Sequence, residues 1–210
     1  MTTLDIYSDP ICPWCYIGKS RLDAAMEIRP DHGFEISWHP FMLNPDMPPE
    51  GMDRRDYLEA KFGSQKAVVE AYLPVQKAAT AGGLPIDLGR IGRTPSTLDA
   101  HRLIHWAGLE GRQSAVVSLL FRAYFAEGAD IGARAILLAV AETAGMDGKV
   151  VARLLDSGAD TDDIRAQDAD VRGRGLRGVP AFVIAGQHVV AGAQEVPFWL
   201  QIIDELAGRA

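Results

Sequence analysis

The chain of 210 residues has two cysteines, Cys12 and Cys15, and both belong to a single Cys-Pro-Trp-Cys motif near its start. Before the motif, residues 3–9 alternate apolar and polar side chains, as a short strand does. After it, Pro13 suits the first turn of a helix, where its missing N–H is harmless, and an apolar stripe continues to residue 30. A second strand pattern occupies residues 34–43. The order strand, helix, strand predicts a parallel pair joined by a right-handed crossover.

The middle of the chain has a different character. A proline-rich loop at residues 44–52 is followed by helical periodicity up to residue 174, and many of the helical segments end in glycine. Strand patterns return at residues 179–184 and 188–192, close enough for a hairpin, before an amphipathic helix at 196–210. We therefore predict one α/β unit formed by residues 1–52 and 175–210, interrupted by an all-helical insertion at residues 53–174.

Composition excludes several classes of partner. Hydrophobic residues make up 48% of the chain, enough for a buried core without disulfide staples. The net charge of -7 argues against a phosphate-binding face, and the longest apolar runs are too short to span a bilayer. The first residues lead into a strand pattern rather than a secretory signal. We expect no nucleic acid or membrane partner and a cytoplasmic location, where a lone cysteine pair is more often catalytic or metal-binding than structural.

The spacing of the two thiols assigns them different roles. Cys12 is expected just before the first helical turn, where unpaired N–H groups and the helix dipole favour the nucleophilic thiolate. Cys15 lies one turn further on the same side and should be more buried, so it can resolve a mixed disulfide formed on Cys12. No histidine separates the cysteines to stabilise the thiolate, so we expect a moderate redox potential and a reductase or isomerase role.

The two cysteines have two other interpretations. The pair could hold half of a zinc site, but structural zinc usually takes four protein ligands and the five histidines do not supply a matching pair. The cysteines could also be two unreactive core residues, since buried free cysteine is common. Strand, C-x-x-C and helix follow one another in the order that dithiol redox chemistry requires. We predict that chemistry, with no metal and no bound cofactor.

A second signal is the segment "RGVPAFVI", with Pro180 at the start of a strand. Pro180 could be an ordinary boundary residue. In an α/β redox unit, however, this loop lies beside the cysteine-bearing helix. A cis Val179–Pro180 bond there would offer the Val179 backbone groups to an incoming extended peptide or thiol ligand.

The stretches "SDPICPWCYIGKSRL", "WHPFMLNPDMPPEGMDRRDYLEAKFG", "AHRLIHWAGLEGRQSAVVSLLFRAYFAEGADI" and "GVPAFVI…VVAGAQ" resemble the DsbA-like proteins of the thioredoxin superfamily, in particular the FrnE branch of dithiol oxidoreductases. The resemblance covers nearly the whole chain and implies that the interrupted α/β unit has a thioredoxin-like fold. It implies Cys12 as nucleophile, Cys15 as resolving thiol and a cis Pro180 facing them. The implied partners are disulfide- or dithiol-containing proteins or small thiols, with glutathione as a possible thiol substrate.

The same fold includes kappa-class glutathione transferases and 2-hydroxychromene-2-carboxylate isomerases, which carry a serine where Cys12 stands and lack the second cysteine. This sequence departs from them by having both thiols. Two alternatives to the dithiol enzyme nevertheless stay open. One is a glutathione-dependent isomerase or transferase acting on a small aromatic compound, and the other is a non-catalytic redox-sensing chaperone that uses the helical insertion as a peptide groove. The oligomeric state is not predicted.

Further residues could shape a substrate site, although each also has an ordinary structural interpretation. Pro13 and Trp14 lie between the two cysteines, and Trp14 could form an aromatic wall beside the thiols. His101 lies in "DAHRL", a stretch that is near the pocket in the glutathione-using relatives. Gln194 ends "AGAQ", whose free N–H groups before a helix could bind a carboxylate. The segment "VVSLLFRAYF" has more apolar residues than a single buried helix stripe requires, and this excess predicts that the insertion makes a substrate groove.

Overall fold

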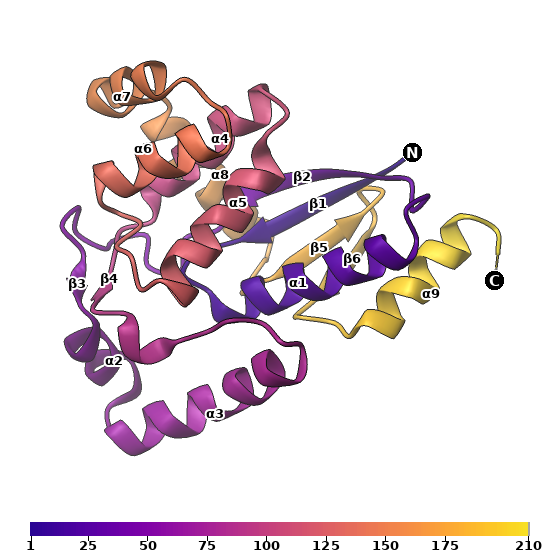
Figure 1. Cartoon of the computed structure of the whole chain (residues 1–210), viewed down its shortest axis with the longest axis horizontal. Coiled ribbons are helices and arrows are strands. Elements are labelled where there is room, and N and C mark those ends of the chain that lie inside the picture. Colours follow the sequence, from indigo (N-terminus) through magenta and orange to yellow (C-terminus); the bar gives the residue numbers. More distant parts are fainter. Residues whose placement is uncertain (210) are drawn as a thin grey trace.

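The computed structural model describes residues 1–209 and contains a four-stranded mixed sheet in the order β2-β1-β5-β6 (Figure 1). The strands are β1 (Thr2–Ser8), β2 (Phe34–Pro40), β5 (Ala181–Ile184) and β6 (His188–Ala191). β1 runs parallel to β2, which confirms the parallel pair predicted from the sequence, and antiparallel to β5. Because the central strand pairs with one strand from each end of the chain, the two ends complete a single sheet.

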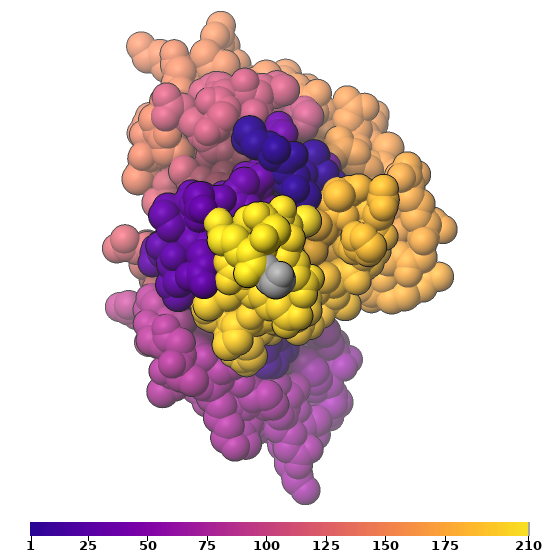
Figure 2. Space-filling model, turned by 90° about the vertical axis from the view of Figure 1, so that its right-hand side faces the viewer, coloured from indigo at the N-terminus to yellow at the C-terminus, as the bar shows by residue number. Residues whose placement is uncertain are grey.

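Two helices cover the same region of this sheet. The cysteine-bearing helix α1 (Pro13–Ile28) and the last helix α9 (Val196–Leu206) contact each other (Figure 1). Figure 2 shows α9, in yellow, on the surface of the molecule. Its inner side carries Trp199, which is fully buried and packs edge-on against Phe182 of β5 with 4.8 Å between ring centroids. This packing ties the end of the chain to the sheet that positions the thiols.

The insertion between β2 and β5 is mainly helical, and the predicted thioredoxin-like fold with a large insertion is confirmed. Its helices are α2 (Arg54–Phe62), α3 (Gln65–Ala81), α4 (Leu98–Leu109), α5 (Gln113–Phe121), α6 (Arg134–Thr143), α7 (Gly148–Ser157) and α8 (Thr161–Gly173), with a 3-10 turn η1 (Leu88–Arg90) and a π-helical segment η2 (Arg122–Ala126). The sequence did not reveal a two-residue ladder between β3 (Met52–Asp53) and β4 (Arg93–Thr94). Across residues 1–209, none of the helices combines the length and apolarity needed to cross a membrane.

Aromatic stacking joins the insertion to α1. The ring of Tyr16, next to Cys15, stacks on Phe121 with centroids 5.2 Å apart and on Phe125 at 5.6 Å. Large apolar residues of the segment "VVSLLFRAYF", residues 116–125, are buried on several sides of the helix rather than along one face. They are Val116, Val117, Leu120, Phe121, Tyr124 and Phe125. The apolar excess that led us to expect a substrate groove is therefore explained by core packing.

Candidate active site

Cys12 is the N-cap residue of α1, and Pro13 occupies the first helical position, as the sequence predicts. The Cys12 carbonyl accepts hydrogen bonds from the N–H groups of Cys15 and Tyr16, at 3.1 and 3.2 Å. Both cysteines are free thiols, with 4% of Cys12 and 1% of Cys15 exposed. The thiol of Cys12 points to the carbonyl oxygen of Val179, 3.7 Å away. The motif and the Val179–Pro180 turn, 167 residues apart in sequence, therefore meet.

The Val179–Pro180 peptide bond is cis, as expected from the sequence. Pro180 is buried against α1, and Gly18 permits this close approach. A Cβ atom at Gly18 would lie 3.2 Å from Cγ of Pro180 and 3.4 Å from Cζ of Phe182. A side chain at position 18 would thus press on the turn that faces Cys12.

The environment of Cys15 keeps its thiol protonated. Burial raises the pKa of Cys15 well above its usual value, and the neighbouring Cys12 raises it further. The Ser8 hydroxyl and the Asp9 backbone oppose this effect in part. A thiol that is protected from ionisation until its neighbour has reacted suits the second step of a thiol exchange.

Asp9, which the sequence analysis overlooked, is fully buried, and its carbonyl oxygen accepts the N–H of Cys12 at 2.9 Å. Its carboxylate accepts the backbone N–H of Ile11 at 3.2 Å and of Leu43 at 2.6 Å. Burial raises the pKa of Asp9 to about 7. Nε2 of His101 lies 4.0 Å from Oδ1 of Asp9 and has no hydrogen-bond partner within residues 1–209. The position of Asp9 between the strand pattern and the motif, in "SDPIC", was the available signal.

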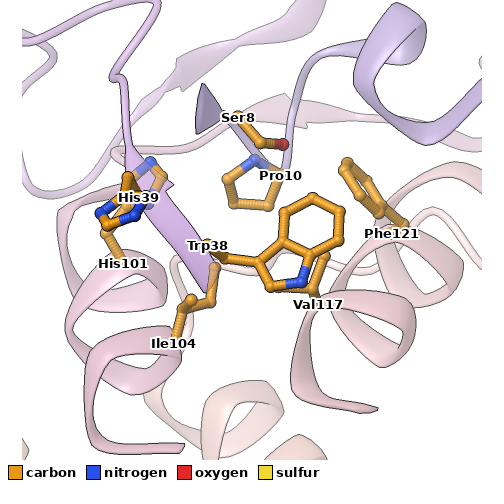
Figure 3. A pocket seen from close by; sticks show the side chains of 8 residues that line it. All are labelled: Ser8, Pro10, Trp38, His39, His101, Ile104, Val117 and Phe121. Atoms are coloured by element: carbon orange, nitrogen blue, oxygen red, sulfur yellow. The ribbon is translucent and has the colours of Figure 1, made fainter. Parts of the chain in front are cut away.

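His101 faces the interior of the molecule. It lines a cavity of about 10 Å³ together with Ser8 at the end of β1, Pro10, Trp38 of β2 and Phe121 of α5 (Figure 3). This volume has room for about one water molecule and not for a substrate. Burial lowers the pKa of His101 to about 4. The buried position of His101 therefore argues against the substrate contact expected from the sequence. It favours an interaction with Asp9 in the interior.

The other expected site residues lie near the surface. Pro13 and Trp14 are half-buried beside the thiols, and Trp14 packs against the core. The side chain of Gln194 donates to the Ala191 carbonyl at 2.7 Å. The N–H of Gln194 donates to the Gly192 carbonyl at 3.0 Å, and that of Gly192 donates to the Pro180 carbonyl at 2.8 Å. The expectation of free N–H groups in this loop is therefore wrong for Gly192 and Gln194, because the loop closes on itself and on the proline turn.

The Asp9–His101 pair predicts two opposite dependences of stability on pH. The pKa of Asp9 is raised from 3.8, so its contribution to the free energy of unfolding is complete below pH 3.8 and is lost as the pH rises through about 7. The pKa of His101 is lowered from 6.5, so its contribution is complete above pH 6.5 and is lost as the pH falls through about 4. In the wild type, the two opposite slopes of unfolding free energy against pH offset each other between about pH 4 and about pH 7.

Single substitutions should uncover each slope in urea unfolding measured from pH 4 to 7. We expect His101→Gln to lose on the order of 2 kcal/mol relative to wild type as the pH rises across this range. Asp9→Asn should gain a similar amount. The double variant should follow the wild-type profile. Because Asp168 and the Arg172 paired with it are unchanged in all variants, this result would show that neither causes the two slopes. Parallel profiles for all four proteins would contradict the assignment.

The helix N-terminal dithiol and the cis-proline turn facing it define a thioredoxin-type site. The model of the DsbA-like thioredoxin domain matches residues 3–204, and the chain belongs to this family. Within residues 1–209, no three His, Cys, Asp or Glu side chains gather into a group that could hold a metal ion.

Solved structures share the fold over almost the entire chain. A probable DsbA oxidoreductase from Streptomyces coelicolor is 30% identical with a TM-score of 0.87, covering 100% of this chain and 92% of its own. The cytosolic disulfide reductase DsbM from Pseudomonas aeruginosa is 22% identical with a TM-score of 0.70, covering 99% and 100%, and has also been solved with GSH. A 2-hydroxychromene-2-carboxylate isomerase is 19% identical with a TM-score of 0.70, covering 99% and 95%. At these lower identities the likeness concerns the fold alone.

Proposed function

We propose that this chain is a thiol–disulfide oxidoreductase that uses Cys12 and Cys15 as a redox-active dithiol. The observation that carries the proposal is the meeting of Cys12 with the Val179–Pro180 turn, at 3.7 Å between Sγ and the Val179 carbonyl oxygen. Cys15 lies directly behind Cys12 as a buried, protonated thiol. This arrangement supplies a nucleophile, a resolving thiol and a backbone segment able to align an extended substrate.

The reaction proceeds in two exchanges. The Cys12 thiolate attacks one sulfur of a substrate disulfide, whose S–S bond breaks as the Cys12–substrate bond forms and the other substrate sulfur leaves as a thiolate. Cys15 then loses its proton and attacks Sγ of Cys12, which releases the second substrate thiolate. Two electrons have passed to the substrate, and the enzyme holds a Cys12–Cys15 disulfide. Two glutathione thiols reduce that disulfide and leave as oxidised glutathione.

Neighbouring residues assist these steps. We assign the proton that Cys15 releases to the carboxylate of Asp9, which is buried three residues before the motif and has a pKa of about 7. His101 then acts as a positioning residue for the Asp9 carboxyl, 4.0 Å from it. Pro13, Trp14 and the Val179 backbone border the thiols on the substrate side. Gln194 holds the loop that closes on the proline turn.

The proposed partners are disulfide-containing proteins or small molecules, with glutathione as the thiol that returns the enzyme to its reduced form. The DsbM structure with GSH supports this choice of reductant by likeness of fold. We also propose a cytoplasmic location, where glutathione favours reduction or isomerisation over net oxidation. A place in the FrnE-like branch is consistent with the long helical insertion between β2 and β5.

Insulin reduction in the presence of glutathione tests the function. We expect wild-type protein to accelerate the precipitation of insulin chains above the rate with glutathione alone. The isomerase alternative predicts glutathione-dependent conversion of 2-hydroxychromene-2-carboxylate with no insulin reduction. The chaperone alternative predicts protection of an unfolded protein from aggregation with no insulin reduction. Because the fold resembles DsbM and the isomerase equally, the discriminating feature is the dithiol.

A further inference from the structure

Arg54, the first residue of α2, is buried without a counter-ion. Only 8% of the residue is exposed, and no carboxylate within residues 1–209 forms an ion pair with it. Its hydrogen-bond partners are three hydroxyl groups: Nη1 donates to Thr94 at 3.2 Å and Tyr124 at 3.3 Å, and Nη2 donates to Tyr72 at 2.6 Å. Burial raises the pKa values of both tyrosines, so these partners are uncharged at neutral pH. The charge of Arg54 is thus held in place but not neutralised.

The guanidinium also keeps unused donors. It has five N–H groups, and three of them bind the hydroxyls. Nε–H and one N–H of Nη2 have no protein acceptor in the part of the chain that the structure describes. Unused N–H groups on Nε and Nη2 can bind the two oxygens of one carboxylate. The rings of Tyr57 and Tyr72 also lie against the guanidinium, with their centroids 5.8 and 5.6 Å from Cζ, but neither ring carries a negative charge. A buried arginine with this arrangement is suited to an anion, since a buried charge without a counter-ion is costly.

A cavity of about 310 Å³ opens beside Arg54, between α2, α3 and the turn η1. Apart from Arg54, Tyr72, Gln76 and Gly89, its walls are aliphatic. These aliphatic residues are Leu58, Val68, Val69, Leu73 and Leu88. Val69 and Leu73, which are 61% and 47% exposed, form an apolar rim of the cavity that is open to solvent. In Figure 1, α2 and α3 lie at one end of the insertion, and no lining residue comes from α1 or the proline turn.

We propose that this cavity binds a small aliphatic carboxylic acid, with the ionised carboxylate on Arg54 and the hydrocarbon chain against the aliphatic walls. The carboxylate supplies the negative charge that the protein does not place near Arg54. The exposed carboxylates of α2 and α3, such as Glu59 and Glu70, lie in solvent and repel the ligand only weakly because water and salt screen them. This site is separate from the dithiol, so its test does not depend on redox activity.

Calorimetric titration with octanoate tests the proposal, with octan-1-ol and acetate as probes that each lack one half of the ligand. We expect saturable binding of octanoate to the full chain and much weaker binding of both controls. Arg54→Met should weaken octanoate binding by about 10-fold or more, since a charge-assisted pair is lost. Octanol binding as tightly as octanoate would overturn the role of Arg54, and no saturable binding would overturn the site.

A second variant keeps the test decisive if Arg54→Met does not fold. Val68→Trp fills the cavity from a half-buried wall and leaves the arginine cluster intact. Its matched control is Val150→Trp, on a partly exposed face of α7 outside the cavity. We expect Val68→Trp alone to abolish octanoate binding, with both variants melting near the wild-type temperature and reducing insulin normally. Unchanged octanoate affinity in Val68→Trp would contradict the proposed location.

Discussion

Replacing Cys12 by serine is expected to lower the rate of insulin reduction by at least about 10³-fold. A serine hydroxyl is not ionised at neutral pH and forms no disulfide, so the first exchange cannot occur. The substitution changes one atom at a buried N-cap, where serine is a favoured residue. The folded state should therefore persist, and the loss of activity would report on chemistry.

The measurement is the initial rate of insulin reduction at several glutathione concentrations, alongside thermal melting of both proteins. A melting temperature close to wild type serves as the control for folding. Substantial reductase activity in Cys12→Ser would show that the dithiol is not the reacting group. Glutathione-dependent isomerisation that survives the substitution would instead favour the isomerase alternative.

Replacing Cys15 by serine should have a different outcome, in which a mixed disulfide on Cys12 accumulates. The first exchange needs only Cys12, whereas release of the substrate needs the second thiol. With a disulfide-containing peptide, we expect most of the Cys15→Ser protein to carry one covalently bound peptide half after mixing. Wild-type protein should carry almost none, because its buried Cys15 resolves the intermediate.

Intact-mass analysis after acid quenching measures this intermediate, and proteolytic mapping locates it. Cys12→Ser, treated identically, is the matched control and should trap little peptide because burial holds the Cys15 thiol protonated. If Cys12→Ser trapped peptide on Cys15 while Cys15→Ser trapped none, the assignment of the two roles would be reversed.

Local sequence patterns predicted the thioredoxin-like unit because its elements depend on near neighbours. The alternation that buries Leu4 and Ile6 indicates a strand, and Pro13 marks the start of a helix. The short separation of the last two strand patterns anticipated the hairpin of β5 and β6, whose turn has positive φ angles at Ala185 and Gly186. The order of these elements then left few topologies for the sheet.

The interior of the site could not be predicted in the same way, since its contacts are distant in sequence. Asp9 meets Leu43 and the α4 residue His101, and Arg54 meets Tyr124 seventy residues away. Local periodicity also cannot distinguish one apolar helix face from a segment packed on several sides. For that reason the apolar excess around Phe121 suggested a substrate groove made by the insertion, whereas these residues pack in the core.

Equilibration of the wild-type protein with graded ratios of reduced and oxidised glutathione tests the central claim most directly. After acid quenching and alkylation, mass analysis counts the free thiols and locates any disulfide. The account predicts one reversible two-electron transition between the free dithiol and an intramolecular Cys12–Cys15 disulfide, with a moderate potential. Glutathione bound to Cys12 without an intramolecular disulfide, or two thiols that stay free at every ratio, would contradict it.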